Sequence, residues 1–232
     1  MDILTYHDQP PYIIDRKSEK GLSYEVINAV NNTMNTSYHI RILPKMRLKK
    51  MLTGKQGAVM IWAVSLTFGG IENAKQHGFI WGKALLYDQQ GFISRINKPV
   101  EYMGPTSLYG LALGGVQGHT YFGLQDDIDS GKIIRINSSK EAKNIRLLLA
   151  QRLDVITMAH SSAKYYENLF QVGNKLYFSK QPLNRYSRHF LASKNQSSHI
   201  DRVNHWLHHA VQNGSYKKLL AKYGLDTLIP PR

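Results

Sequence analysis

The pattern of hydrophobic and polar positions in the first part of the chain predicts alternating strands and helices. Residues 3–6 have the pattern of a short strand, and a helix from Gly21 has apolar positions at three- and four-residue spacing. Strands are expected at 38–43 and 58–64, with a helix over 44–54 between them. The run 58–64 is continuously apolar, as in a strand buried on both faces of its sheet. This order predicts an α/β unit with a largely parallel sheet.

A second unit of the same kind is expected further along the chain. The expected strands are 111–116, 133–136 and 154–158. One helix is expected to begin near His119-Thr120, and two more are expected over 139–151 and 161–169. Two further stretches, 85–96 and 177–191, have the pattern of crossings between two lobes, and the tail 200–223 is helical. The pattern therefore predicts a chain of two α/β lobes.

Composition supports a folded protein and excludes several chemistries. Of the 232 residues, 42% are hydrophobic and 20% are charged, close to globular averages, so wholesale disorder is excluded. No run approaches the roughly 18 apolar residues that cross a bilayer. The chain has no cysteine, which excludes a disulfide scaffold, a thiolate metal site and a cysteine nucleophile.

Charge is the most unusual bulk property. The chain has 30 Lys and Arg against 16 Asp and Glu, a net charge of +14. Such an excess suggests nucleic acid, an anionic membrane surface or an anionic ligand as a partner. The densest clusters, 45–50 and 217–222, have no interleaved aromatic residues of the kind that bind single strands. We interpret both clusters as solvated helix faces.

The first residues lack the basic segment and apolar core of a signal peptide. Because a strand pattern starts at residue 3, we expect a mature chain whose leader has been removed and whose Met1 was added for expression. A native cytoplasmic start is the alternative.

Several short motifs, in this order and spacing, resemble the family 3 extracytoplasmic solute-binding proteins. This family comprises two-lobed receptors of ABC transporters for amino acids and other small polar solutes. The motifs are Pro10-Pro11-Tyr12, Gly21-Leu22-Ser23-Tyr24-Glu25-Val26, Pro44-Lys45-Met46-Arg47, Leu52-Thr53-Gly54, Gly114–Gly118, Leu153-Asp154-Val155-Ile156, Tyr165-Tyr166, Asn213-Gly214-Ser215-Tyr216 and Lys222-Tyr223-Gly224.

The resemblance implies a type II periplasmic binding protein-like fold, in which each lobe is a mostly parallel sheet flanked by helices. Two hinge crossings would join lobe 1, residues 1–89 and 184–232, to lobe 2, residues 90–183. The lobes would close on a solute between them, because a solute that contacts both stabilises the closed state. The expected setting is the periplasm, with an ABC permease or a membrane sensor as partner, no cofactor, no metal, no nucleic acid and a monomeric state.

Two residues typical of amino-acid-binding members are missing. An Arg after the third strand of the first lobe would hold the ligand carboxylate, but the stretch 62–75 contains no Arg. An Asp before the paired tyrosines would hold the ammonium, but Ala159-His160 stands at that place. Each such contact contributes roughly 1.5–3 kcal/mol. We therefore expect a neutral polar or anionic solute rather than a standard zwitterionic amino acid.

The candidate ligand-binding residues lie near the ends of the expected strands and at the expected helix starts. Ligands of open α/β sheets bind at the carboxyl ends of strands, and a helix start near His119 would favour an anion. The candidates are His7, Gln9, Tyr12, Trp62, Ser65, Thr67, Gly118, His119, Thr120, Tyr121, His160 and Ser161. Structural interpretations remain open: Trp62 is as compatible with the core, Tyr12 with joining its loop to the first helix, and Asp154 with a turn at a strand start.

Two other classes of function remain as alternatives. One is an enzyme on this scaffold, similar to dehydratases, with His7, His119 or His160 as acid or base, although no known catalytic motif is present. The other is a basic protein that binds nucleic acid or a membrane. On the terminal helix His205 and His209 form an i, i+4 pair, but no carboxylate follows at a ligand spacing, so no metal is expected.

Overall fold

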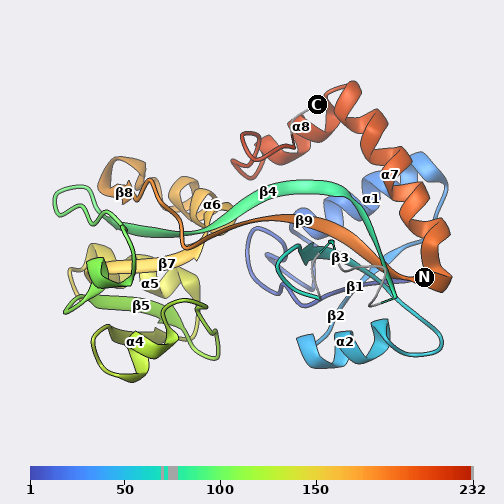
Figure 1. Cartoon of the computed structure of the whole chain (residues 1–232). Helices are drawn as coiled ribbons and strands as arrows, with labels where there is room; N and C mark the ends of the chain where they lie inside the picture. Colours follow the sequence, from blue (N-terminus) through green and yellow to red (C-terminus); the bar gives the residue numbers. More distant parts are fainter. Residues whose placement is uncertain (69–70, 73–77, 231–232) are drawn as a thin grey trace. The chain divides into compact units, whose positions relative to one another are not determined.

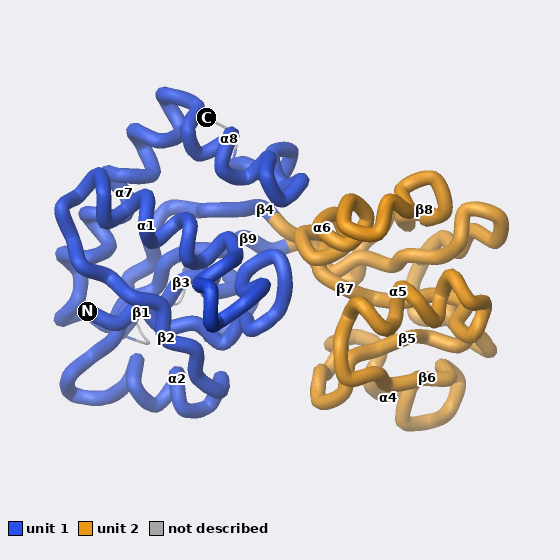
Figure 2. The backbone as a smooth tube through the Cα atoms, turned by 180° about the vertical axis from the view of Figure 1, so that it is seen from behind, with its two compact units in different colours: residues 1–87, 186–232 blue, residues 88–185 orange. Residues whose placement is uncertain are grey.

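The computed structural model describes residues 1–68, 71–72 and 78–230. The chain forms two compact units, shown in different colours in Figure 2. Unit 1 comprises residues 1–87 and 186–232, and unit 2 comprises residues 88–185. The chain passes from one unit to the other twice, after residue 87 and after residue 185, whereas the resemblance implies crossings after residues 89 and 183.

Unit 1 contains a sheet with strand order β2-β1-β3-β9. Strand β1 pairs in parallel with β2 and with β3, whereas β9 is antiparallel to β3. The parallel pairs confirm the predicted alternation of strands and helices, and the antiparallel strand is the returning crossing. The elements of this unit are β1 (Asp2–Thr5), α1 (Leu22–Met34), β2 (His39–Ile42), α2 (Lys45–Leu52), β3 (Val59–Val64), the first part of β4 (Phe79–Arg95), most of β9 (Asn184–Ser193), α7 (Ser197–Gln212) and α8 (Ser215–Ala221).

Apolar side chains at helical spacing attach the helices of unit 1 to its sheet. In α1 the residues Leu22, Val26 and Val30 are fully buried, and the helix ends at Asn35, whose φ of 50° is left-handed. Figure 1 shows α1, α7 and α8 together on one side of the strands and α2 on the other. Glu25 of α1 accepts hydrogen bonds from Lys222 and Tyr223, which ties the end of the chain to this layer.

Unit 2 repeats the arrangement with strand order β4-β7-β5-β6 and with β8 beside β4. Strand β5 is parallel to β6 and β7, and β4 is antiparallel to β7 and β8. Each unit is therefore a mixed α/β structure with a parallel centre, as expected. The further elements are β5 (Ala112–Val116), α4 (Gln125–Asp129), β6 (Ile134–Ser138), α5 (Glu141–Leu149), β7 (Val155–Ala159), α6 (His160–Phe170) and β8 (Leu176–Phe178), with short 3-10 turns at Pro105–Leu108, Gly173–Lys175 and, in unit 1, Lys194–Gln196.

The expected helix start at His119-Thr120 is wrong. The chain forms turns there, and α4 begins only at Gln125 and has five residues. The physical reason is the backbone of Gly118 and Gly123, whose φ angles of 78° and 87° do not fit a right-handed helix. The helix dipole proposed to favour an anion at residues 118–121 is therefore absent.

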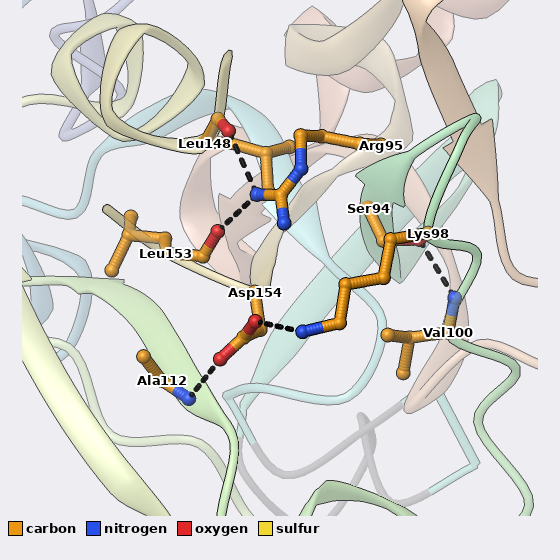
Figure 3. Close-up of polar contacts among 8 residues, drawn as sticks. All are labelled: Ser94, Arg95, Lys98, Val100, Ala112, Leu148, Leu153 and Asp154. Carbon is orange, nitrogen blue, oxygen red and sulfur yellow. Dashed lines mark hydrogen bonds and ion pairs between the residues drawn. The ribbon is translucent and has the colours of Figure 1, made fainter. Parts of the chain in front are cut away.

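Asp154 has a structural role, because its carboxylate joins the starts of two strands. One oxygen accepts a hydrogen bond from the Ala112 amide at 3.1 Å, and the other lies 2.8 Å from Lys98 Nζ (Figure 3). Nearby, Arg95 donates to the carbonyls of Leu148 and Leu153, which closes the turn between α5 and β7 (Figure 3). The contacts of the Asp154 carboxylate with Lys98 and with the Ala112 amide lower its pKa, and Lys98 is the largest cause. They agree with the interpretation of Asp154 as a turn residue.

Paired aromatic residues on α6 pack into the core of unit 2. Tyr166 is buried in a cluster with Ile145, Leu148 and Ile156, and Tyr165 packs against the same cluster. The paired tyrosines therefore serve the packing of unit 2. None of the helices in the described part of the chain is long and apolar enough to cross a membrane.

Candidate functional site

In unit 1, the candidate residues gather where β1 and β3 end. His7 follows β1 by two residues, and Ser65 follows β3 directly. Just before its end, β3 has a register shift against β9 between Met60 and Ala63, and Trp62 has a φ of 65°. A bulky residue in a left-handed conformation is a backbone outlier, and such outliers and bulges concentrate at functional sites. The end of β3 is therefore a candidate binding site.

Arg188 places a guanidinium at this strand end. It lies on β9 directly opposite Val64, and only 3% of its surface is exposed. The guanidinium carbon lies 4.8 Å from the Tyr12 ring centre and 5.1 Å from that of Tyr186, within cation–π range. One terminal nitrogen donates to the Tyr186 hydroxyl at 3.2 Å, and the other lies 3.4 Å from His7 Nε2. The buried guanidinium of Arg188 thus contacts three aromatic side chains, those of Tyr12, Tyr186 and His7.

Two predicted binding residues, Tyr12 and Trp62, are part of the interior. Both are fully buried, with ring centres 5.1 Å apart, and Trp62 donates from its indole nitrogen to the Ser23 hydroxyl at 2.9 Å. His7 is 6% exposed, and its Nε2 lies 3.0 Å from the Trp62 carbonyl oxygen. Their burial agrees with the alternative that the sequence left open, in which Trp62 belongs to the core and Tyr12 packs its loop, and the two rings form a floor next to Arg188 and His7.

Partly exposed polar residues surround this floor. Ser65 and Thr67 are half-buried, and the Ser65 hydroxyl accepts a hydrogen bond from the Ser187 amide at 2.9 Å. Gln9, two residues after His7 in the chain, is also half-buried. Burial raises the pKa of the Tyr6 phenol, and the charge of Arg188 and a hydrogen bond to Thr67 act in the opposite direction. We name this set of Tyr6, His7, Tyr12, Trp62, Ser65, Thr67, Tyr186 and Arg188 the unit 1 site.

In unit 2, the candidates at the start of α6 form hydrogen bonds within the fold. Ser161 is fully buried, and its amide and hydroxyl donate to the two carboxylate oxygens of Asp88 at 3.1 Å and 2.7 Å. Asp88 Oδ1 also accepts from the Gln89 amide at 2.9 Å. His160 is partly exposed, and burial lowers its pKa while Asp88 acts in the opposite direction. The acidic side chain of Asp88 therefore lies near Ala159-His160, where the Asp typical of amino-acid-binding receptors is missing. Its carboxylate caps the start of α6.

The segment 118–121 is a loop that Arg135 holds in place. Arg135 donates to the carbonyls of Val116 and His119, and its guanidinium lies 4.9 Å from the centre of the Tyr121 ring. Tyr121 is buried, and its hydroxyl accepts the Val116 amide. Gly118, His119 and Thr120 are exposed. The loop thus presents exposed polar groups without the helix that the sequence suggested.

Sequence reasoning missed Arg188 and Asp88, the two charged groups at these places. Both lie inside the stretches 85–96 and 177–191, whose pattern predicts only crossings between lobes. A charged residue within a mostly apolar strand pattern was the available signal, since such a residue is rarely buried without a specific environment. The stretch 62–75, where the resemblance implies an Arg, includes residues 69–70 and 73–75, which lie outside the described part of the chain.

A metal site is not formed by the described residues. Among them there is no group of three or more His, Asp or Glu side chains that could hold a metal ion. The rings of His205 and His209 lie 4.5 Å apart on the exposed face of α7, as their spacing predicts.

The fold of the chain is that of the bilobal periplasmic binding proteins. The ligand-binding core of GluR0 from Nostoc punctiforme, solved in complex with L-glutamate, matches with a TM-score of 0.68 and 15% identity, covering 96% of this chain and 97% of that one. A histidine kinase sensor domain with similarity to periplasmic binding proteins matches with a TM-score of 0.69 and 17% identity, covering 99% and 97%. The L-cystine solute receptor of Neisseria gonorrhoeae, unliganded and open, matches with a TM-score of 0.68 and 13% identity, covering 99% and 94%.

These similar structures are binding proteins, receptors and a sensor domain, and at these identities they establish the fold. No protein-family model matches the sequence, and no curated protein matches it either.

Proposed function

We propose that the protein is a solute-binding receptor for a small polar molecule. The observation that carries this proposal is the unit 1 site, where hydroxyl, imidazole and guanidinium groups gather at the carboxyl ends of β1 and β3. In open α/β sheets this edge is where ligands bind. Half-buried polar groups above an aromatic floor suit a molecule with several hydrogen-bonding groups.

The solute we propose is not a standard zwitterionic amino acid. In unit 2 the carboxylate near the expected ammonium position, Asp88, accepts hydrogen bonds from Gln89 and Ser161 and caps α6. A carboxylate whose oxygens serve the fold binds an incoming ammonium less well than one directed to a ligand. The remaining candidates of unit 2, His119, Thr120 and His160, suit neutral or anionic groups.

The cellular role that fits this site is delivery of a solute in the periplasm. We propose an ABC permease or a membrane sensor as the partner, because the similar structures include receptors of transporters and a kinase sensor domain. The protein would act as a monomer without a cofactor, and the two crossings, β4 and β9, would allow hinge closure on the solute.

A thermal-shift screen of small polar metabolites tests this proposal. A solute at 100 times its dissociation constant stabilises the folded state by about 2.7 kcal/mol, which raises the melting temperature by several degrees. We expect stabilisation by neutral or anionic compounds and none by lysine or arginine. Strong stabilisation by those basic amino acids would contradict the proposed solute class.

Two further measurements separate the receptor from the other classes. A stabilising solute should be recovered unchanged after incubation with the protein, and its conversion to a product would indicate an enzyme. Binding to DNA, RNA or anionic vesicles at low salt that weakens steeply with ionic strength would instead support a basic nucleic-acid or membrane protein.

A further inference from the structure

The two densest basic clusters of the chain have different surroundings in the folded protein. In the cluster 217–222, Lys222 forms an ion pair with Glu25 of α1. In the cluster 45–50, which lies on α2, no cation forms an ion pair with a carboxylate of the described residues. The residues outside the described part contain no Asp or Glu. The cluster on α2 is therefore a surface of positive charge that the fold does not neutralise.

The sequence keeps acidic residues away from this surface over a long stretch. Residues 26–71 contain six Lys and Arg but no Asp or Glu. One of the six, Arg41, forms an ion pair with Asp2. The other five are all exposed: Lys45, Arg47, Lys49, Lys50 and Lys55. Soluble surfaces normally mix both signs of charge, and a patch of one sign attracts molecules of the opposite charge. This segment is therefore a candidate surface for an acidic partner.

These charges do not stabilise the helix that carries them. The first turn of α2 contains Lys45 and Arg47 and no acidic residue, although cations there oppose the helix dipole. Lys45 and Lys49 are four residues apart, a spacing at which like charges repel. Lys45 gains a contact with the Tyr6 ring, whose centre lies 5.5 Å from its Nζ. Among the described residues neither a carboxylate nor a ring is paired with Arg47, Lys49 or Lys50, so folding alone does not account for their charge.

The core of unit 1 holds α2 so that its basic side faces outward. Leu48 and Leu52 are 0% and 2% exposed and belong to one buried cluster of this unit. Met46 is 76% exposed, and Lys50, one turn further along, is exposed on the same side of the helix. Figure 1 shows α2 on the side of the strands opposite to α1, α7 and α8. We name the exposed residues of this segment the α2 surface: Lys45, Met46, Arg47, Lys49, Lys50 and Lys55.

The make-up of the α2 surface favours an acidic protein over a lipid or a nucleic acid. A helix that binds a membrane surface inserts its apolar face into the lipid, but the apolar face of α2 is buried in the core. Proteins that bind single-stranded nucleic acid carry aromatic side chains among their cations, and the α2 surface has none. Methionine and arginine are both enriched in protein interfaces, and methionine adapts to the shape of its partner. Met46 and Arg47 are adjacent here.

We propose that the α2 surface docks on an acidic surface of a protein partner. In this arrangement carboxylates of the partner pair with Arg47, Lys49 and Lys50, and an apolar side chain of the partner covers Met46. Charges of this kind speed association and make it sensitive to salt. The inference rests on the proposed function only in taking the partner to be the permease or the sensor, whereas the acidic chemistry of the partner follows from α2 itself.

An acidic peptide tests the inference before the natural partner is known. The probe is a short fluorescent peptide with glutamates around a central leucine, and its control has glutamine in place of every glutamate. Fluorescence anisotropy measures the binding of both peptides to the full chain at low and at higher salt. We expect the acidic peptide to bind about 10-fold more tightly than the glutamine peptide, since several exposed ion pairs form. Its affinity should fall as salt screens those pairs.

Variants matched in charge locate the binding. Lys49→Gln with Lys50→Gln should lower the affinity for the acidic peptide by about 3- to 30-fold, the range for the loss of two exposed ion pairs, and should weaken its salt dependence. Lys217→Gln with Lys218→Gln removes two adjacent exposed lysines of α8 and should stay within about twofold of the original protein. Met46→Ser should lower the affinity by the same factor at both salt concentrations, because it removes an apolar contact. Circular dichroism verifies that each variant is folded.

The possible outcomes separate this inference from the proposed function. If the acidic peptide does not bind, or if the two lysine pairs matter equally so that only net charge counts, the inference is wrong. It is also wrong if RNA, DNA or phosphatidylglycerol vesicles bind the α2 surface more tightly than the peptide. The exchanged lysines lie outside the unit 1 site, so the solute screen should give the same thermal shifts with every lysine variant. A screen in which no solute stabilises the protein contradicts the receptor function, while the peptide result still decides the docking surface.

Discussion

The two units share an architecture but use their buried charges differently. In unit 1 the buried guanidinium of Arg188 is surrounded by aromatic rings and half-buried hydroxyl groups at a strand end. In unit 2 the buried carboxylate of Asp88 accepts hydrogen bonds from the first turn of α6. The Asp88 carboxylate serves a helix start, whereas the Arg188 guanidinium packs against the rings of Tyr12 and Tyr186. The difference teaches that burial alone does not identify a binding residue.

The largest expected effect comes from the floor of the unit 1 site. Trp62→Ala should reduce the free energy of unfolding by about 3–5 kcal/mol, because it removes a fully buried side chain and leaves a cavity. Urea denaturation followed by circular dichroism measures this loss. Trp62→Phe keeps most of the volume and serves as the control, with a smaller loss. A loss below about 1 kcal/mol for Trp62→Ala would contradict the assignment of this side chain to the core.

A pair of serine variants tests the contrast between the two units directly. Ser161→Ala removes a hydrogen bond to the buried Asp88 carboxylate and should lower stability by about 1.5–3 kcal/mol with little change in solute affinity. Ser65→Ala, at the half-buried edge of the unit 1 site, should lower stability by about 1 kcal/mol or less. It should also weaken solute binding more than Ser161→Ala does.

Denaturation and calorimetry on the same samples compare the two variants. If Ser161→Ala weakens binding more than Ser65→Ala, the assignment of the unit 2 residues to the fold is incorrect.

A smaller effect is expected in acid for unit 2. The pKa of Asp154 is lowered in the folded protein, chiefly by Lys98 and then by the Ala112 amide. Its contribution to stability is therefore complete above the pKa of the unfolded chain, about 4, and is lost as the pH falls through the lower folded value. Asp154→Asn should be less stable than the original protein at pH 6, and the difference should shrink at pH 3. Equal differences at both pH values would argue against this network.

The smallest effect concerns a histidine of unit 1. Burial lowers the pKa of His189, whose ring nitrogens lie 2.9 Å from the Gly82 carbonyl and 2.7 Å from the Ser187 hydroxyl. Below about pH 6.5 His189 is protonated in the unfolded chain but stays neutral in the folded protein, so the free energy of unfolding should fall as the pH drops below that value. His189→Asn, which can still donate to Gly82, should lose less stability than the original protein between pH 7 and pH 5. Melting temperatures at the two pH values measure the difference.

Much of the fold could be predicted from the sequence because it depends on local patterns. The apolar run before Ser65, the helical spacing after Gly21 and the strands on either side of α5 all lie within a few residues of where periodicity places them. The predicted helix at His119 failed because Gly118 and Gly123 adopt positive φ angles that an apolar–polar pattern does not encode.

The candidate site was only partly predictable, since it combines residues distant in the sequence. His7, Ser65 and Thr67 could be found because each follows a strand, and position relative to a strand end is visible in the sequence. Arg188 is separated from Val64 by more than a hundred residues, and only the antiparallel pairing of β9 with β3 brings them together.

By itself, the sequence determined that this protein has two α/β units, few acidic residues and a large positive charge. Composition and periodicity are properties of the chain alone. Tertiary structure decided which charges are buried and what each one serves. Arg188 and Asp88 both lie in mostly apolar stretches, and the sequence does not show whether either is buried or what it contacts. Burial and hydrogen-bond partners arise only when distant strands and helices meet. That is why Asp88 caps a helix and Arg188 lies beside the end of β3.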